Sequence, residues 1–261
     1  MAFSKKIVAL GSRLKKCRNV ITIGVKPDFS EYDPEDKKLI QNESKIYYPS
    51  EYYAELFDVF GKNIFPSYQN YRFAQDKIKQ SAAFNIFGLP HPRTKVFYGK
   101  RQKDNILNFF QFPFIGKIPR GSAKGNGVFF IRNNDDLATY LELSSPAYIQ
   151  EYLETDRGIR VVIIGTRVVH AYWRIAPVNE FRCNVSVGAE IRLGGIPEGA
   201  LALALEVAHK CKWDDVGIDI IEYKNNYFIL EANMKYGMEG FRKAGIDYIK
   251  LMETMIENNE I

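Results

Sequence analysis

The sequence has few of the residues that bind transition metals or carry redox chemistry. Its 261 residues include 3 cysteines and 3 histidines, and no two cysteines stand in the close pair that a zinc or redox site usually needs. These residues are Cys17, Cys183, Cys211, His91, His170 and His209. We interpret them as buried or incidental residues, and reduced thiols fit the cytosol. No Ser-His-Asp or Cys-His arrangement is evident either, which argues against a protein nucleophile.

Long apolar runs are also missing. The longest, VVIIGTRVVHAYW from Val161, contains Arg167 and is too short to span a bilayer. The N-terminal stretch MAFSKKIVALGSRLKK has an apolar core too brief for a secretory signal. We therefore expect a cytoplasmic protein with no membrane partner. Its 46% hydrophobic and 26% charged residues are typical of a globular chain, folded as one large domain or as two or three small units.

Positive charge is present in excess but unevenly distributed. The formal net charge is +5. One basic cluster comprises Lys5, Lys6, Arg13, Lys15, Lys16, Arg18 and Lys26; the other comprises Arg93, Lys95, Lys100, Arg101, Lys103, Lys117, Arg120 and Lys124. Solvated surface explains the first cluster. In the second, glycines and apolar strands are interleaved with the charge, so an anionic ligand is a serious alternative. No nucleic-acid signature accompanies either cluster, and we expect no nucleic-acid partner.

The apolar patterns predict three successive units. The first 70 residues form a small unit with strands at 20–25 and 45–48 and helices from Pro34 and after Ser50. Ser67 is expected to cap one long helix that ends at Gly88, with its apolar residues at helical spacing: Phe73, Ile78, Ala82 and Ile86. The second unit has strands from 94, at 114–118 and at 128–131, and helices at about 102–110 and 135–143. The third has a strand from 147, a hairpin at Gly165-Thr166, a helix from 198, a hairpin over 216–233 and a helix from 246.

The stretch FPFIGKIPRGSAKGNGVFFI, residues 112–131, contains a glycine-rich loop between two apolar strands. It is not the common nucleoside-triphosphate P-loop, because no Gly-Lys-Ser/Thr closes it before a helix, and it lacks the dinucleotide glycine spacing. Glycines at 121, 125 and 127 would let backbone N–H groups approach a phosphate, with Lys117 supplying charge from the strand end. A mobile hairpin tip explains the same glycines, and the loop alone does not decide between the two.

Acidic residues in the last hairpin are predicted to converge. If the loop is Lys224-Asn225-Asn226, opposed residue numbers sum to 450, which sets Asp219 opposite Glu231 and places Asn233 on the same face. Ile218, Ile220, Phe228 and Leu230 then share the other face. Carboxylates and an amide oxygen suit Mg²⁺. A two-residue Asn225-Asn226 turn would move Glu231 to the other face, so the metal interpretation predicts the longer loop. The alternative interpretation is a set of solvated polar positions on a sheet edge.

A third group of polar residues lies between these two features. Arg174, Arg182 and Asn184 occur within RVVHAYWRIAPVNEFRCN, on or after a predicted strand. Each arginine alone is explained as surface charge. Together, ahead of an acidic hairpin, the three side chains indicate binding of phosphate or carboxylate.

In this order the motifs resemble the ATP-grasp ligases, and in particular the RimK-like branch that adds glutamate to protein or peptide carboxylates. The resemblance runs from Tyr71 to Ile256 through FAQDK, GLPHPRT, FIGK, YIQEYL, GIRVVIIGTRVVHAYWR, EFRCN, VGIDII, ILEAN and MEGFRKAGIDY. It implies an α+β fold in which two α+β subdomains, 71–146 with the glycine-rich lid and 147–261 with the hinge and metal hairpin, grip ATP. Residues 1–70 would be a small α/β pre-ATP-grasp domain.

The resemblance also implies roles for individual residues. ATP would be bound by Lys117 and the loop residues Gly121, Ser122, Gly125 and Gly127, by the hinge residues Gln150, Glu151, Tyr152 and Leu153, and by Arg182 and Asn184. Asp219, Glu231 and Asn233 would hold one or two Mg²⁺ ions, for which Mn²⁺ can substitute. Arg160 and Arg174 would lie near the reacting groups. The implied reaction joins a carboxylate to an amine through an acyl phosphate, and the implied substrates are small molecules or peptides, with a protein acceptor as one option.

Three departures from the family's pattern leave alternatives open. Gly158 stands where the family usually has Asp, VSVGA replaces His-Arg-Gly-Gly after Asn184, and Lys235-Tyr236-Gly237 replaces Ser-Pro-Gly. The chain could therefore be a nucleotide-binding regulatory protein without ligase activity, or a kinase of a small alcohol. A homo-oligomer is compatible with the sequence.

Overall fold

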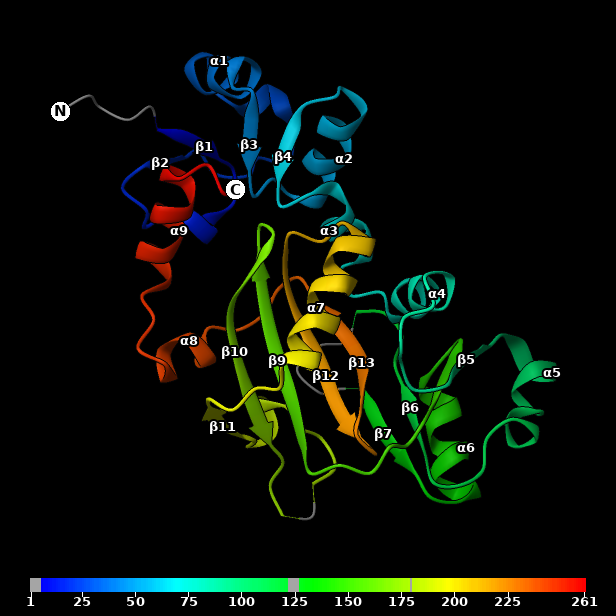
Figure 1. The fold of residues 1–261 in the computed structure, drawn as a ribbon. Coiled ribbons are helices and arrows are strands. Elements are labelled where there is room, and N and C mark those ends of the chain that lie inside the picture. Colours follow the sequence, from blue (N-terminus) through cyan, green and yellow to red (C-terminus); the bar gives the residue numbers. More distant parts are fainter. Residues whose placement is uncertain (1–5, 122–126, 179) are drawn as a thin grey trace.

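The computed structural model describes residues 6–121, 127–178 and 180–261. In these ranges the strands form three β-sheets, which follow one another along the chain (Figure 1). The first sheet lies with the C-terminal helix at one end of the molecule, the third sheet occupies the middle of the view, and the second lies at its lower right.

The first sheet is parallel, with strand order β2-β1-β3-β4. Its strands are β1 (Ile7–Ala9), β2 (Val20–Thr22), β3 (Lys45–Tyr47) and β4 (Asn63–Phe65), and its helices are α1 (Pro34–Asn42) and α2 (Glu51–Val59). Ser50 caps α2 as predicted, because its side chain accepts a hydrogen bond from the Tyr53 amide. Strands β1 and β4, each three residues long, were not predicted.

The long helix predicted from Ser67 to Gly88 is wrong. The chain forms α3 (Tyr68–Phe73) and α4 (Lys77–Ile86), and α4 starts afresh at Asp76, whose carboxylate accepts from the Lys79 amide. The Ser67 hydroxyl caps neither helix and donates to the Lys212 carbonyl. The buried side chains of α4 are Lys77, Gln80, Ser81, Ala83 and Phe84, whereas Ile86 is 79% exposed. The break rotates α4, so a different face is buried from the one that a continuous helix would bury.

The second sheet is antiparallel, with strand order β5-β8-β6-β7. It comprises β5 (Thr94–Phe97), β6 (Phe114–Lys117), β7 (Val128–Ile131) and β8 (Ala147–Glu151), with α6 (Asn134–Leu143) packed on one face. The predicted helix over 102–110 is replaced by α5 (Gly99–Lys103) and a 3₁₀ turn (Ile106–Asn108). Asn105 ends α5 by donating to the Arg101 carbonyl, a local bond of the kind by which Asn side chains compete with helix continuation.

The third sheet is antiparallel and has five strands in the order β11-β10-β9-β12-β13. These are β9 (Arg157–Ile164), β10 (Arg167–Ile175), β11 (Glu190–Leu193), β12 (Asp215–Tyr223) and β13 (Asn226–Asn233). Helices α7 (Glu198–Cys211) and α4 cover one face, where Phe84, Val207 and Trp213 belong to the largest apolar cluster. The chain ends with α8 (Glu239–Lys243) and α9 (Tyr248–Glu257), and α9 packs against the first sheet.

The three sheets do not map simply onto the predicted units. Strand β8 begins at Ala147 but pairs with β5 and β6 of the second sheet, and α4 packs against the third sheet. The division at residues 70 and 146 stays a prediction. The positions of β8 and α4 matter for function, because both elements carry side chains into the space between the second and third sheets.

Candidate nucleotide-binding site

A cleft between the second and third sheets brings most of the predicted site residues together. It encloses about 920 Å³ of empty space, including its open mouth. The predicted residues that line it are Lys117, Gln150, Glu151, Tyr152, Leu153, Arg174, Arg182, Asn184, Asp219 and Glu231. Gly158, the departure from the family's Asp, lines it too.

Two lysines bring buried positive charge to this cleft. Lys117 is the last residue of β6, and burial lowers the pKa of its amine to about 8, although Glu231 opposes that shift. Lys77, the first residue of α4, is also buried, and its amine lies 3.9 Å from a Glu231 carboxylate oxygen. The sequence prediction missed Lys77. Lys77 begins a helix in which the nearby polar residues Gln80 and Ser81 are also buried, and this polar group was the available signal. The sequence prediction placed a different face of the helix in the core, so it did not assign Lys77 to the site.

Aromatic and aliphatic side chains form the walls at the hinge end. Phe130 of β7 stacks on Phe181 with ring centroids 5.3 Å apart and meets the edge of Tyr152 at 4.8 Å. Ile115, Ile221 and Leu230 also line the cleft. Flat apolar walls of this kind suit a purine ring. The aromatic cluster was not predicted, because its members come from three separate segments of the chain.

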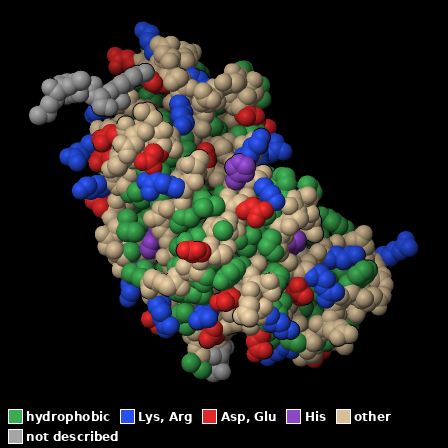
Figure 2. Space-filling view, viewed as in Figure 1, with side chains coloured by type: hydrophobic (Ala, Val, Ile, Leu, Met, Phe, Trp, Pro, Cys, Tyr) green, Lys and Arg blue, Asp and Glu red, His purple; other side chains and the backbone are tan. Residues whose placement is uncertain are grey.

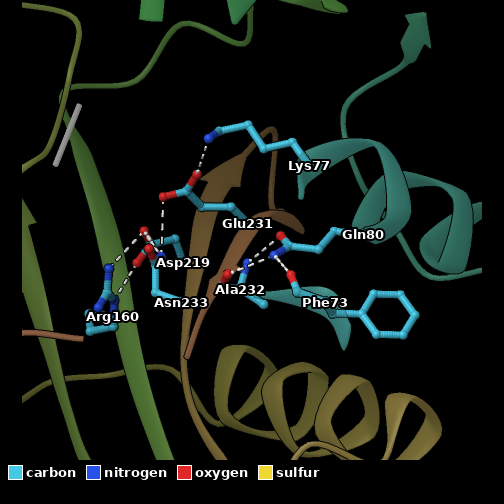
Figure 3. Close-up of polar contacts among 8 residues, drawn as sticks. All are labelled: Phe73, Lys77, Gln80, Arg160, Asp219, Glu231, Ala232 and Asn233. Carbon is cyan, nitrogen blue, oxygen red and sulfur yellow. Dashed lines mark hydrogen bonds and ion pairs between the residues drawn. The ribbon is translucent and has the colours of Figure 1, made fainter. Parts of the chain in front are cut away.

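The predicted acidic set comes together at the other end of the cleft (Figure 3). The Asn233 side-chain amide donates to Asp219 and to Glu231, at 3.2 Å in both cases. Strands β12 and β13 set Asp219 opposite Glu231 and Gly217 opposite Asn233, as predicted.

The reason given for that pairing was wrong. The turn is neither of the two considered but Lys224-Asn225, and both of these residues have positive φ. Next to this turn, the residue numbers of opposed pairs sum to 449. A β-bulge at Leu230 inserts one residue and shifts the sum to 450 at the acids. The apolar face is therefore Ile218, Ile220, Ile229 and Ala232, while Leu230 lines the cleft and Phe228 is not among the core residues.

A buried side chain from α4 fixes the position of these acids. Gln80 accepts a hydrogen bond from the Ala232 amide at 2.9 Å and donates to the Ala232 carbonyl at 2.9 Å, so it pairs with the outer edge of β13 as a neighbouring strand would (Figure 3). Ala232 lies between Glu231 and Asn233. Gln80 was not predicted as a site residue.

Two arginines hold Asp219. Arg160 of β9 makes a bidentate contact with the carboxylate, with N–O distances of 2.5 and 2.9 Å, and Arg174 of β10 pairs with the same carboxylate. Burial alone would raise the pKa of Asp219, but the two guanidinium groups lower it to about 2. The Nε atom of Arg174 is buried without a hydrogen-bond partner in the described part of the chain. Buried donors without a partner are uncommon in folded proteins, and Arg174 is one of the residues that line the cleft.

The remaining predicted residues are Arg182 and those of the glycine-rich loop. Arg182 is held by Glu180 through a bidentate contact at 2.9 and 2.7 Å, so part of its charge is already neutralised. Gly121 and Gly127 both have positive φ, and Gly127 accepts from the Ile118 amide. Neither glycine is among the cleft's lining residues. Ser122 and Gly125 lie outside the described residues.

The donor set of the acidic cluster fits a hard cation. Asp219, Glu231 and Asn233 offer carboxylate and amide oxygens, the ligands that Mg²⁺ prefers together with water and phosphate oxygens. Within residues 6–121, 127–178 and 180–261, no group of three or more His, Cys, Asp or Glu side chains could hold an ion by itself. Binding of Mg²⁺ here would therefore depend on Asn233 and on ligand phosphates.

Comparison with known proteins agrees with this geometry. Residues 74–256 match the model of the RimK-like ATP-grasp domain. The chain belongs to this family. RimK-like ATP-grasp domains therefore account for more than half of the chain, including both sheets that line the cleft.

Named relatives of this family are glutamate ligases. The chain is 28% identical over 194 residues to a probable alpha-L-glutamate ligase of Vibrio parahaemolyticus, which covers 71% of this chain and 64% of the relative. It is 25% identical to the ribosomal protein bS6–L-glutamate ligase of Escherichia fergusonii, over 71% of this chain and 64% of the relative. The chain thus spans less than two thirds of the length of these relatives.

Solved structures confirm the predicted α+β ATP-grasp fold. A RimK domain ATP-grasp protein from Sphaerobacter thermophilus has a TM-score of 0.70 at 12% identity, covering 95% of this chain and 98% of that one. D-alanine–D-alanine ligase from Bacillus anthracis also gives 0.70, at 14% identity and 97% coverage of both chains. At these identities the likeness shows the fold alone. None of the helices described here is long and apolar enough to cross a membrane.

Proposed function

We propose that this protein is an ATP-dependent ligase that joins a carboxylate to an amine through an acyl phosphate. The observation that carries the proposal is the meeting of two buried lysines with Asp219 and Glu231 in one cleft, with Asn233 hydrogen-bonded to both acids. Family membership supports ATP as the substrate and a divalent metal as the cofactor. We also propose that the site binds one or two Mg²⁺ ions, or Mn²⁺ in their place.

The chemistry needs fixed charges rather than a protein nucleophile. A carboxylate does not acylate an amine, because oxide would have to leave; transfer of the ATP γ-phosphate to the carboxylate supplies phosphate as the leaving group. Lys77 and Lys117 would neutralise the phosphates, and Mg²⁺ on Asp219, Glu231 and Asn233 would offset the charge that moves between oxygens. Arg160 keeps Asp219 ionised and oriented, and Arg174, which lines the cleft, would bind an oxygen of the acyl phosphate.

We further propose that the amine is an amino acid such as glutamate and that the acceptor is a peptide, a protein or a small molecule. The support is the naming of the relatives, two of which act on glutamate by name. The cytoplasm, where ATP is abundant, is the proposed location.

A mass-spectrometric screen tests the proposal. The purified protein is incubated with Mg²⁺-ATP, an amino-acid panel and a fractionated cell extract, and the expected result is an ATP-dependent mass gain of one amino-acid residue on an acceptor. The variant Glu231→Gln, run in parallel, should abolish that gain. Binding of ATP with no acceptor-dependent turnover would favour the regulatory alternative, which the change to Gly158 motivates. A stable phosphorylated product without an amide would favour a kinase.

A further inference from the structure

A second hollow lies where strand β8 ends and strand β6 begins. It encloses about 690 Å³ of empty space, including its open mouth, and shares Glu151 and Tyr152 with the nucleotide cleft. The other residues that line it are Arg93, Leu107, Asn108, Phe109, Phe110, Gln111, Pro113 and Phe114. We call this hollow the outer groove. The proposed ligase chemistry makes no use of it.

Exposed cations that form no ion pair with the described residues occur at four positions within residues 93–101, and one of them, Arg93, lines the outer groove. Arg93, Lys95, Lys100 and Arg101 are all exposed, and none forms an ion pair with any residue that the structure describes. Two of these cations lie on the aromatic lining: the Arg93 guanidinium is 4.7 Å from the Phe110 ring centre, and the Lys95 amine is 3.6 Å from that of Phe109. Figure 2 shows Lys and Arg side chains gathered over the lobe that carries β5 and α5. These residues belong to the second basic cluster of the sequence, and most of that cluster lies outside the nucleotide cleft.

The same lobe also offers apolar contacts and a free sheet edge. Leu107 and Phe109 are 44% and 46% exposed, although both are large apolar residues. Strand β5 is the edge strand of its sheet and pairs only with β8 among the described strands. A peptide can add to such an edge through main-chain hydrogen bonds, with its side chains reaching the neighbouring pockets.

We propose that the outer groove and strand β5 bind an acidic polypeptide segment. Its carboxylates would pair with Arg93, Lys95, Lys100 and Arg101, and its apolar side chains would cover Leu107 and Phe109. A nucleic acid would use the cations but has no main chain to pair with β5 and no aliphatic group for Leu107. The inference goes beyond the proposed ligase function and does not depend on it, because it rests on a surface separate from the reacting groups.

Fluorescence anisotropy with a labelled peptide tests the proposal. The probe is a 12-residue peptide of eight glutamates and four leucines, titrated with the 261-residue protein at 50 mM and 200 mM salt. The variant K95E/K100E/R101E should weaken binding at least about 10-fold, since rim charges govern this kind of electrostatic association. The matched variant K15E/K16E/K38E changes the net charge equally at exposed positions far away along the chain and should weaken binding less than about 2-fold.

Two further arms make the result decisive. Phe109→Ser should weaken peptide binding about 5-fold while ATP affinity, measured by calorimetry, stays unchanged. Competition with a 12-nucleotide single-stranded RNA should displace the peptide poorly. Peptide binding that survives K95E/K100E/R101E, an equal loss in both triple variants, tighter binding of the RNA, or no peptide binding at all would overturn the proposal.

Discussion

At the scale of single residues, Asp219 is where the charges of the site converge. It is buried, it contacts Arg160 and Arg174, and its pKa of about 2 keeps it ionised at all ordinary pH values. Because its pKa is below the unfolded value, it stabilises the fold above about pH 4 and loses that contribution as the pH falls through 2. Removing the Asp219 carboxylate would leave two buried cations unpaired, so substitutions of Asp219 would change both stability and activity. Glu231, which is less buried, gives a cleaner probe.

Glu231→Gln is expected to lower turnover about 100-fold or more, because it removes a charge that would hold Mg²⁺ at the transferred phosphate. The measurement is ADP release in the presence of the acceptor found by mass spectrometry. Glu222→Gln is the matched control, since Glu222 lies on the same hairpin with similar exposure and pairs with Arg157 instead. Turnover within a few-fold of wild type for Glu231→Gln would remove the metal assignment.

Lys117 should make ATP affinity depend on pH. With a pKa of about 8 in the free protein, its amine is charged at pH 7 and largely neutral at pH 9, so ATP affinity should fall about 10-fold over that range. Calorimetric titration at pH 6.5 to 9.5 measures this. Lys117→Arg, which stays charged, should flatten the profile without abolishing binding, whereas Lys117→Met should bind weakly at every pH. A wild-type profile that is flat, or equal slopes in all three proteins, would contradict the expectation.

At the scale of elements, the acidic set depends on the joint between α4 and β13. Strand β13 is a sheet edge, and near its end the Gln80 side chain supplies the missing partner for both main-chain groups of Ala232. Gln80 also donates to the carbonyl of Phe73, the last residue of α3, and so links α4 to the end of α3 across the break. One side chain thus connects the start of α4, with Lys77, to the strand that carries Glu231 and Asn233.

Gln80→Leu should therefore both destabilise the fold and weaken Mg²⁺-ATP binding. The buried amide and carbonyl of Ala232 would lose their partners, at a cost of about 2 kcal/mol in the free energy of unfolding measured with urea. ATP affinity, measured well below the unfolding transition, should fall while binding of metal-free ATP changes less. Gln41→Leu, at an exposed position, serves as control and should change neither quantity. A purely global loss of stability, with normal Mg²⁺-ATP affinity in the folded fraction, would contradict the positioning role.

The sequence prediction paired Asp219 with Glu231 because two errors offset each other: the assumed turn was one residue too long, and the extra residue of the bulge was not foreseen. It did not reveal the bulge at Leu230, since nothing in that residue type requires an extra, unpaired position. Nor did it reveal the break at Gln75, whose positive φ is unusual for a non-glycine residue. Lys77 and Gln80 were missed for the same reason: their burial depends on the direction that α4 takes after that break, and on a strand about 150 residues away.

At the scale of the whole molecule, a buried polar cluster joins the first sheet's unit to the third sheet. Arg13 stacks over Tyr236 and Tyr248 at 4.7 and 5.0 Å, and Tyr48 and Tyr236 donate to the two oxygens of Asp215 at 2.8 and 2.5 Å. Burial raises the pKa of Asp215, and the charge of Arg13 opposes that shift. Tyr236 stands in the loop after Asn233, where the chain departs from its family, and the cluster gives that departure a structural reason.

Arg13→Met should cost about 3 kcal/mol of unfolding free energy, because Asp215 would keep a buried charge with no cation near it. Urea unfolding measures the loss. The double variant Arg13→Met/Asp215→Asn should recover part of it, and Arg18→Met, whose side chain is 92% exposed, should change stability by less than about 0.5 kcal/mol. Strict additivity of the two single changes would mean that Arg13 and Asp215 do not interact.

The bulge at Leu230 has a consequence for how homologous chains are compared. It separates the turn at Lys224-Asn225 from the acids, so the two ends of the hairpin run in different registers. A relative that lacks the extra residue can keep the same opposition of acids with one residue fewer. In an alignment of such relatives, the gap belongs beside Glu231, within the strand, where gaps are ordinarily penalised most, rather than in the turn.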